Sequence, residues 1–292
     1  MKRPHPHRSG KKATRAAFEC AHPLVATVVD DGGEVRAALD RALSAGVDGL
    51  VVVAEFPQRT GRLLQETLLM TDPQDAQKRL LRGFNGRIRS AVEYLRVARR
   101  ASARTWLGLA LPGFLPSIAL QTDTFRVDQS DLRLGGVFFD DPLLNQSPLE
   151  RRDFSAGSLL AELRAINRSD QRRTLHQHFG SQCWWIATLT GDTAASADLG
   201  HGSFVHVLVE LLHYVEALAI PASAPPFFAS SVARVSAGRL PILATEVTPG
   251  TLRDVWSRAR GFVASPAEPE TLVSLARLIR ELPAPSKRAD RT

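Results

Sequence analysis

PLVATVVDDGGEVRAALDRALSAGVDGLVVVA, residues 23–54, is the stretch that decides the fold. Its first seven residues are rich in β-branched side chains and predict a buried strand. The next segment repeats apolar side chains at the 3.6-residue period of an amphipathic helix: Val35, Ala38, Leu39, Ala42 and Leu43. Gly46 supplies the helix stop, and residues 48–54 predict a second strand. A strand, a helix and a second strand within about thirty residues predict a right-handed βαβ unit.

Predicted strands and helices continue to alternate after residue 54, with polar segments between some of them. Short apolar runs predict further strands at residues 106–111, 136–139, 183–189, 227–232, 241–247 and 261–265. Amphipathic stretches between them predict helices, so about eight strands alternate with helices. This pattern favours a single (β/α)₈ barrel over a doubly wound sheet. The sixth βα unit is the irregular point, because a full covering helix is missing near residues 233–240.

Composition and length fit one large domain. The chain has 292 residues, of which 44% are hydrophobic and 23% charged, and barrels of this kind have about 250 residues. No run reaches the roughly 18 apolar residues of a membrane span, and the first residues form no apolar signal segment. Cys20 and Cys183 are too few for a disulfide framework. We therefore expect a cytoplasmic protein without membrane contact.

The formal charge of +7 belongs mostly to the two ends of the chain. Residues 1–17 hold six basic residues and no acid, and the last ten residues add a further net +2. We expect a basic, flexible tail at 1–17, a barrel at 18–283 and a flexible C-terminal tail at 284–292. Charge confined to tails indicates weak contact with nucleic acid or an acidic protein rather than the main function.

Several segments resemble, in order, a predicted TIM-barrel family related to BtpA and SgcQ. They are HPLVATVVDD, AGVDGLVVVAEF, WLGLAL, LGGVFFDD, LHQHFG, PILATEVTPGTL and GFVASP, spread over residues 22–282. The resemblance implies a TIM-type barrel with its site at the strand ends. Glu246 stands where the family has glycine, and Gly250-Thr251 stand where it has Glu-Asn. These changes weaken a phosphate site built from backbone N–H groups and suit a divergent or inactive member.

Carboxylates end or closely follow most of the predicted strands, where barrel enzymes carry their catalytic groups. They are Asp30, Asp31, Glu55, Asp140, Asp141, Asp192 and Glu246. Like charges brought together need a cation or a hydrogen-bonding ligand. A divalent metal such as Mg²⁺, or a polyhydroxylated or cationic compound, would meet that need. The alternative is structural, because aspartate also suits turns and helix caps.

We assign the catalytic role to Glu55, Asp140 and Asp141, since the resemblance places the ends of the second and fourth strands at the pocket. Ligand contact is assigned to the other groups at the same ends: Asp30, Asp31, Asp192, Glu246, Thr248 and Ser265. Thr248 precedes Pro249 and also fits the N-cap of a helix, which is the interpretation we favour. Whether a metal binds is left open.

Two hypotheses about function follow. In the first, the chain is an enzyme, or a binding protein derived from one, for a small sugar- or nucleoside-like compound. In the second, it is a catalytically inactive barrel that acts as an interaction or regulatory module. That module would use the basic tail and the arginine-rich region at 82–104, although a solvated helix face explains those arginines more simply. Either protein could form a homo-oligomer.

Overall fold

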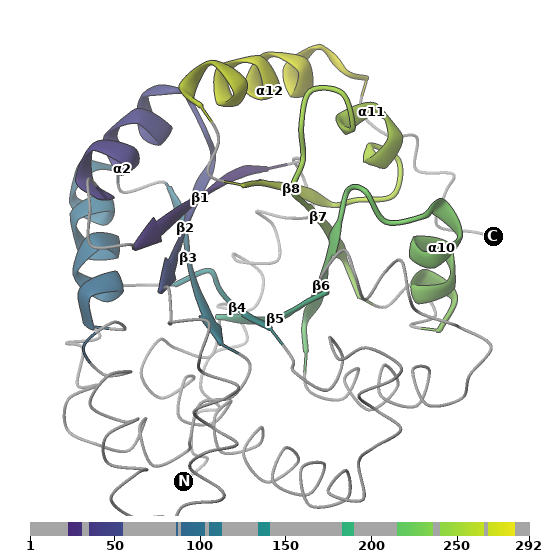
Figure 1. Ribbon diagram of the computed structural model, residues 1–292, viewed down its shortest axis with the longest axis horizontal. Coiled ribbons are helices and arrows are strands. Elements are labelled where there is room, and N and C mark those ends of the chain that lie inside the picture. The colour runs from purple at the N-terminus through teal and green to yellow at the C-terminus, as the bar shows by residue number, and fades with distance from the viewer. Residues whose placement is uncertain are drawn as a thin grey trace, which may run out of the picture.

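The chain forms a closed barrel of eight parallel strands ordered β1 to β8 (Figure 1). The computed structural model describes residues 23–30, 35–54, 86, 89–102, 105–112, 134–140, 183–189, 215–235, 240–265 and 268–283. In these segments, no helix has the length and apolar character needed to cross a membrane. The predicted (β/α)₈ architecture is confirmed.

Helices lie outside the barrel, between consecutive strands (Figure 1). The labelled elements are β1 (Leu24–Asp30), α2 (Val35–Ser44), β2 (Gly49–Ala54), β3 (Trp106–Pro112), β4 (Gly136–Asp140), β5 (Trp184–Thr188), β6 (Ala217–Pro221), α10 (Pro226–Val235), β7 (Ile242–Thr245), α11 (Leu252–Val255), β8 (Gly261–Ala264) and α12 (Pro269–Glu281). A further helix covers residues 89–101.

The first βαβ unit forms where its sequence predicts it. β1 pairs with β2 in parallel from Val25 opposite Gly49 to Asp30 opposite Ala54. α2 buries one stripe of its surface: Val35, Leu39 and Ala42. Gly46 ends the turn after α2 with φ 78°, a left-handed conformation that suits glycine.

The sixth unit corrects two sequence predictions. Residues 227–232, predicted as a strand, lie within α10, whereas the sixth strand is β6. Phe228 and Val232, four residues apart, are fully buried, as on one face of a helix. Pro226 begins α10, where its missing N–H costs little. α10 is thus the covering helix that the sequence interpretation could not find.

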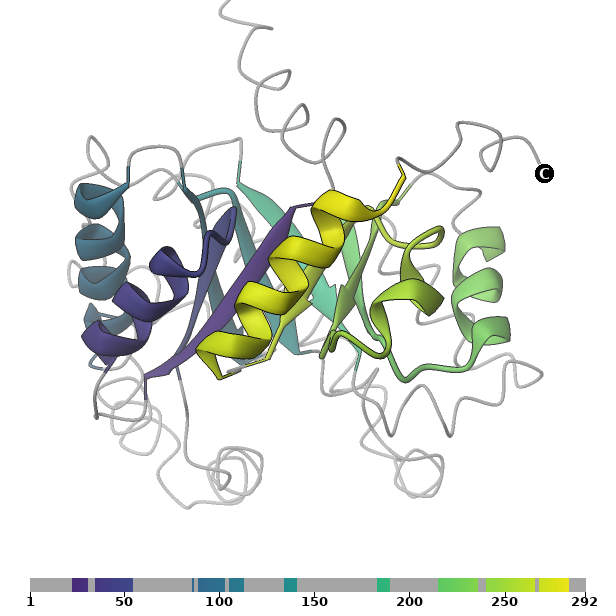
Figure 2. The ribbon, with the colours of Figure 1, turned by 90° about the horizontal axis from the view of Figure 1, so that it is seen from above.

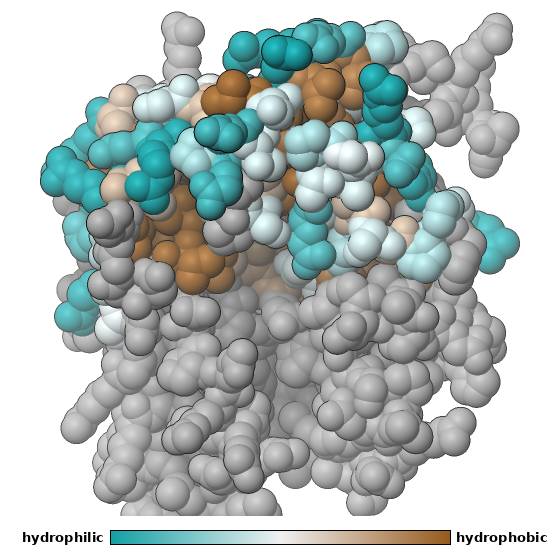
Figure 3. Space-filling model, turned by 45° about the horizontal axis from the view of Figure 1, so that its top comes forward, coloured by the Kyte–Doolittle hydropathy of each residue, from teal (hydrophilic) through white to brown (hydrophobic). Residues whose placement is uncertain are grey.

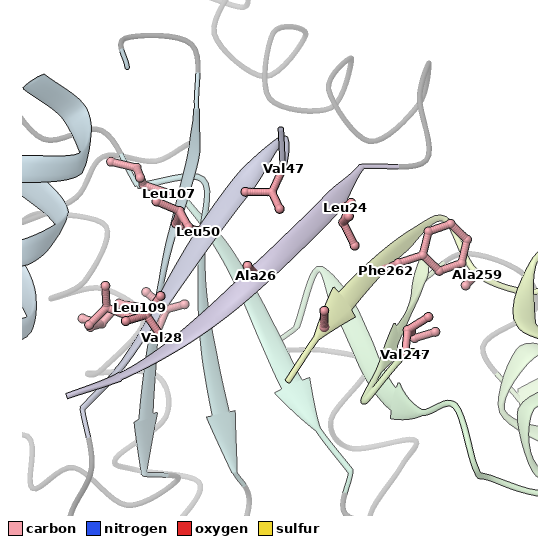
Figure 4. Packing of buried hydrophobic residues seen from close by; sticks show 14 of the residues in the cluster. Leu24, Ala26, Val28, Val47, Leu50, Leu107, Leu109, Val247, Ala259 and Phe262 are labelled. Atoms are coloured by element: carbon pink, nitrogen blue, oxygen red, sulfur yellow. The ribbon is translucent and has the colours of Figure 1, made fainter. Parts of the chain in front are cut away.

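Alternate residues of each strand belong to two separate cores. Leu24, Ala26 and Val28 of β1 belong to the outer core between strands and helices (Figure 4). Val25 belongs to a second cluster, inside the barrel. On the face that Figure 3 shows, hydrophilic and hydrophobic residues of the described segments lie side by side. This two-sided burial is what parallel barrel strands require.

Above Trp106 and Trp184 at the N-terminal end of the interior, strand registers order the interior positions into five layers of four, and each layer takes its residues from alternate strands, as is typical of this fold. From the N-terminal to the C-terminal edge they are the small layer (Gly49, Gly136, Ala217, Gly261), the lower apolar layer (Val25, Gly108, Ile186, Leu243), the upper apolar layer (Val51, Phe138, Ala219, Val263), the threonine layer (Thr27, Ala110, Thr188, Thr245) and the rim layer (Val53, Asp140, Pro221, Ser265).

The Trp106 indole fills the N-terminal half of the interior. It packs edge-on against Phe138, with ring centroids 6.1 Å apart and planes at 87°. Glycines make room for it: a Cβ atom would lie 1.9 Å from Trp106 Nε1 at Gly135 and 2.9 Å from Trp106 Cζ2 at Gly136. The apolar layers and this ring close the barrel from below.

Two carboxylates tie strand starts together at the N-terminal edge. The Leu24 N–H donates to Asp48 Oδ2 at 3.0 Å, and the Trp185 N–H donates to Glu216 Oε2 at 2.7 Å. Asp48 directly precedes β2 and Glu216 directly precedes β6, so the same bond recurs four strands apart. Charge-assisted bonds of this kind are stronger than neutral ones. We call this pair the edge clamps.

Candidate functional site

From the upper apolar layer toward the C-terminal edge, side chains inside the barrel first become partly exposed at the threonine layer. All four of its residues are half-buried: Thr27, Ala110, Thr188 and Thr245. The layer directly below is buried: its three largest residues, Val51, Phe138 and Val263, are only 1%, 5% and 4% exposed. The threonine layer is therefore the deepest partly exposed layer on the C-terminal side of the interior. We call the C-terminal end of the barrel the mouth and the threonine layer its floor.

The floor presents hydroxyl groups from three different strands. Thr27 Oγ1 donates to the Ala264 carbonyl oxygen at 2.9 Å, which links β1 to β8 and fixes the orientation of this hydroxyl. Each threonine oxygen has two lone pairs in addition to its proton. A floor of this kind can accept and donate hydrogen bonds while the apolar layers beneath it exclude water.

The sequence interpretation missed these threonines, although a signal was present. An Ala-Thr pair occurs in three of the predicted strands, at 26–27, 187–188 and 244–245. In each pair the alanine is buried outside the barrel and the threonine occupies an interior position. The same dipeptide, a small residue facing outward followed by a threonine facing inward, recurs on odd-numbered strands. Such a repeat indicates a polar layer inside the barrel.

Two of the predicted carboxylate positions end strands directly at the mouth. Asp140 is the last residue of β4, in register with Pro112 of β3 and Thr188 of β5. Asp30 is the last residue of β1, in register with Ala54. Asp140 thus belongs to the rim layer, immediately above the threonine layer.

The remaining predicted site residues divide into two groups. Glu246, Thr248 and Ser265 follow β7 and β8 at the same C-terminal edge, and all three are exposed. The others lie outside the described residues: Asp31, Glu55, Asp141 and Asp192. The described strand ends therefore converge on one edge of the barrel, as the sequence predicts for parallel strands.

Glu246 holds an uncommon backbone conformation. Its φ is 55°, and among the described residues it is the non-glycine residue with positive φ. The left-handed region costs such a residue roughly 1–2 kcal/mol. The next residue returns to the barrel, because the Val247 N–H donates to the Val263 carbonyl oxygen at 3.3 Å. Strain of this kind is often found at functional sites.

Thr248 and Thr251 close a reciprocal capping box in front of α11. The Thr251 N–H donates to Thr248 Oγ1 at 3.3 Å, and the Thr248 N–H donates to Thr251 Oγ1 at 3.0 Å. The Leu252 N–H adds a 3.0 Å bond to the Thr248 carbonyl oxygen. Pro249 has no N–H, and the N–H groups of Thr248, Thr251 and Leu252 donate within the turn, so few backbone donors of this turn are left for a ligand. This geometry fits a helix start better than an anion cradle, but the N-cap of α11 is Thr251 and not Thr248 as predicted.

Metal ligands do not gather in the part of the chain that the structure describes: no group of three or more His, Cys, Asp or Glu side chains lies together there. Cys183 is buried beside the N-terminal edge. Burial raises the pKa of its thiol, and the nearby Glu216 carboxylate raises it further. This cysteine is therefore a protonated core residue rather than a nucleophile at neutral pH.

No protein-family model matches the sequence, and a search of curated proteins finds no match. Solved structures do match over nearly the whole length. The tryptophan synthase alpha chain from Legionella pneumophila subsp. pneumophila has 12% identity and a TM-score of 0.55, covering 94% of this chain and 99% of that one. The alpha subunit from Legionella pneumophila str. Paris has 13% identity and a TM-score of 0.52, covering 94% and 97%.

A protein from Aquifex aeolicus VF5 is similar to the same degree, with 13% identity and a TM-score of 0.51 over 93% of this chain and 94% of that one. At these identities the likeness concerns the fold. Together with the closed parallel sheet, it defines the class of protein: the chain is a TIM-type barrel.

Proposed function

We propose that the chain is an enzyme, or a binding protein derived from one, that holds a small sugar- or nucleoside-like ligand at the C-terminal mouth of the barrel. The threonine layer is the observation that carries this proposal. Its residues are half-buried directly above the upper apolar layer. Hydroxyl groups in a partly desolvated site suit a ligand that is itself rich in hydroxyl groups, because each partner both donates and accepts.

Asp140 is the proposed central carboxylate. Its position lies one layer above the threonines and in register with Thr188, so a ligand resting on the threonine layer would lie next to it. With Glu55 and Asp141, which follow strand ends in the sequence, it forms the proposed catalytic group. One of the three would orient a ligand hydroxyl and another would transfer a proton as general acid or base.

The other acidic positions around the mouth are proposed ligand contacts: Asp30, Asp31, Asp192 and Glu246. Ser265, exposed after β8, adds a hydroxyl group. A divalent cation such as Mg²⁺ would be held by these oxygens together with the ligand. An unphosphorylated compound fits better than a phosphorylated one, since an acidic edge repels anions and the capping box occupies amides of the β7–α11 turn.

A thermal-shift screen tests the proposal without assuming a reaction. The panel contains free sugars, nucleosides and their phosphorylated forms, each with and without Mg²⁺. A ligand present at 100 times its Kd should stabilise the fold by about 2.7 kcal/mol. Unphosphorylated polyhydroxy compounds are expected to give the largest shifts.

Variants then locate the site for any compound that binds. Thr188→Val removes one floor hydroxyl at nearly constant shape and should weaken binding about three- to tenfold. Asp140→Asn should weaken it by more than tenfold, because the bond lost involves a charge. Thr271→Val in α12, on the outside of the barrel, is the matched control. Binding that is unchanged in both mouth variants would refute the proposal.

A further inference from the structure

Half-buried apolar side chains occupy one side of the mouth. They are Val29 of β1, Val53 of β2 and Ala110 of β3, on three consecutive strands. The parallel registers set Val53 beside Val29 on one neighbouring strand and beside Ala110 on the other. The three residues therefore form a continuous surface, which we call the apolar wall.

Strand alternation places the apolar wall inside the barrel. Val25 and Val51 belong to the interior cluster, and Ala110 packs against that cluster. Side chains two or four residues apart on a strand point to the same face. Val29 follows Val25 by four residues and Val53 follows Val51 by two, so both lie on the interior face at the C-terminal end of their strands.

Hydroxyl groups occupy the opposite side of the mouth. Thr188 of β5 and Thr245 of β7 belong to the threonine layer, and Ser265 follows β8. We call these three residues the hydroxyl side. Because the barrel is closed, β2 and β3 lie across it from β6 and β7, as Figures 1 and 2 show. Thr27 of β1 also belongs to this group, since its Oγ1 atom lies 2.9 Å from the Ala264 carbonyl oxygen of β8.

Ala110 interrupts the threonine layer on the side of the apolar wall. Its three counterparts on the other odd-numbered strands are threonines, and alanine lacks the Oγ1 and Cγ2 atoms that they carry. The floor therefore leaves more room at β3 and presents no hydroxyl there. The neighbouring residues one layer below, Val51 and Phe138, are buried and apolar. A ligand meets only hydrocarbon at this corner of the floor.

Strand propensity explains part of this pattern, because valine is favoured in strands. It accounts for Val29 and Val53 as single residues. It does not account for Ala110, since alanine is disfavoured in strands and the equivalent positions hold the better strand former threonine. Room for an apolar part of a ligand, between the apolar wall and the hydroxyl side, explains a small residue at this position.

We propose that the ligand of the mouth is a nucleoside, with its flat base on the apolar wall and its sugar hydroxyl groups toward the hydroxyl side. This inference rests on the proposed function and selects one of its two ligand classes. A free sugar carries hydroxyl groups around its whole ring, and those turned to the apolar wall would lose their hydrogen bonds to water without replacement. A nucleoside separates its hydroxyl groups from its planar ring, and proteins hold such rings against apolar side chains.

Isothermal titration calorimetry of the full chain with matched compounds tests this inference. Adenosine and uridine are each compared with methyl β-D-ribofuranoside, which keeps the sugar hydroxyl groups and replaces the base by a methoxy group. At least one nucleoside should bind at least about tenfold more tightly than the riboside. Its heat-capacity change should also be more negative, because burial of apolar surface has that signature.

Substitutions in the apolar wall locate the base. Val53→Thr adds a hydroxyl group at nearly unchanged shape and should weaken nucleoside binding about fivefold or more, with less than about a twofold effect on the riboside. Ala110→Ser is the second variant, and it adds one hydroxyl group at the floor. Val97→Thr is the matched control, since Val97 is half-buried on the helix at 89–101, outside the barrel. Thermal unfolding verifies the fold of each variant.

The outcomes separate this inference from the proposed function. If the riboside binds as tightly as both nucleosides and Thr188→Val weakens it, the nucleoside assignment is wrong and the proposed function stands. Nucleoside binding that both Val53→Thr and Ala110→Ser leave unchanged would also overturn the inference, because the base would then lie elsewhere. If neither sugars nor nucleosides bind, the proposed function and this inference fail together.

Discussion

Replacing Gly135 with alanine tests whether the Trp106 indole is the element that closes the barrel from below. The new methyl carbon would lie 1.9 Å from Trp106 Nε1 and 2.4 Å from Trp106 Cδ1. The backbone has little freedom to retreat, because the Gly135 N–H donates to the Leu107 carbonyl oxygen at 2.7 Å and the Gly135 carbonyl oxygen accepts the Trp184 N–H at 2.9 Å. The indole must therefore move.

Overpacking of this kind costs about 1–3 kcal/mol, and the severity of the contact places Gly135→Ala at the upper end. Urea unfolding measures the loss as a lower midpoint at unchanged slope. Gly250→Ala is the matched control, since its methyl group would meet only Thr248 Oγ1, at 3.8 Å. It should change the free energy of unfolding by less than about 0.5 kcal/mol.

A double-mutant cycle separates this contact from other effects of the methyl group. In a Trp106→Leu background the space is free, so Gly135→Ala should cost less than about 0.5 kcal/mol, and the coupling should exceed about 1 kcal/mol. The reasoning is refuted if Gly135→Ala costs the same with and without the indole, or if it costs no more than Gly250→Ala.

Two further changes probe single residues. The raised pKa of the Cys183 thiol means that the folded state keeps a proton which the unfolded state releases above about pH 9, the ordinary pKa of a thiol. The free energy of unfolding should therefore fall above that pH by up to about 1.4 kcal/mol per unit, a contribution that Cys183→Ala removes and that pH-dependent urea unfolding detects. Glu246→Gly should relieve the left-handed strain and raise stability by about 0.5–1 kcal/mol, net of the greater flexibility of glycine. Glu246→Ala keeps the strained backbone. Equal urea midpoints for the two variants would therefore argue against backbone strain at this position.

Local patterns were sufficient for most of the fold. The first βαβ unit follows from residues 23–54, because each element there has an unambiguous period and Gly46 separates the helix from the strand. The sixth unit was misassigned because short apolar runs do not distinguish a strand from a buried helix. Pro226, together with two buried residues four apart, was the better signal.

The candidate site was predicted at the level of strand ends only. Asp30 and Asp140 end their strands as expected, since alternation and turn residues mark where a strand stops. The threonine layer was missed because membership of a layer depends on the register between strands, which accumulates around the whole barrel. No single segment of sequence contains that information.

The edge clamps have a consequence for how the cylinder holds together. The same carboxylate-to-amide bond stands before β2 and before β6, so each half of the barrel fastens its own first pair of strands by local means. Neither half depends on the other for this fastening. Loss of one clamp therefore leaves the other bond intact. The pairing of β1 with β2 and the pairing of β5 with β6 are stabilised independently of each other.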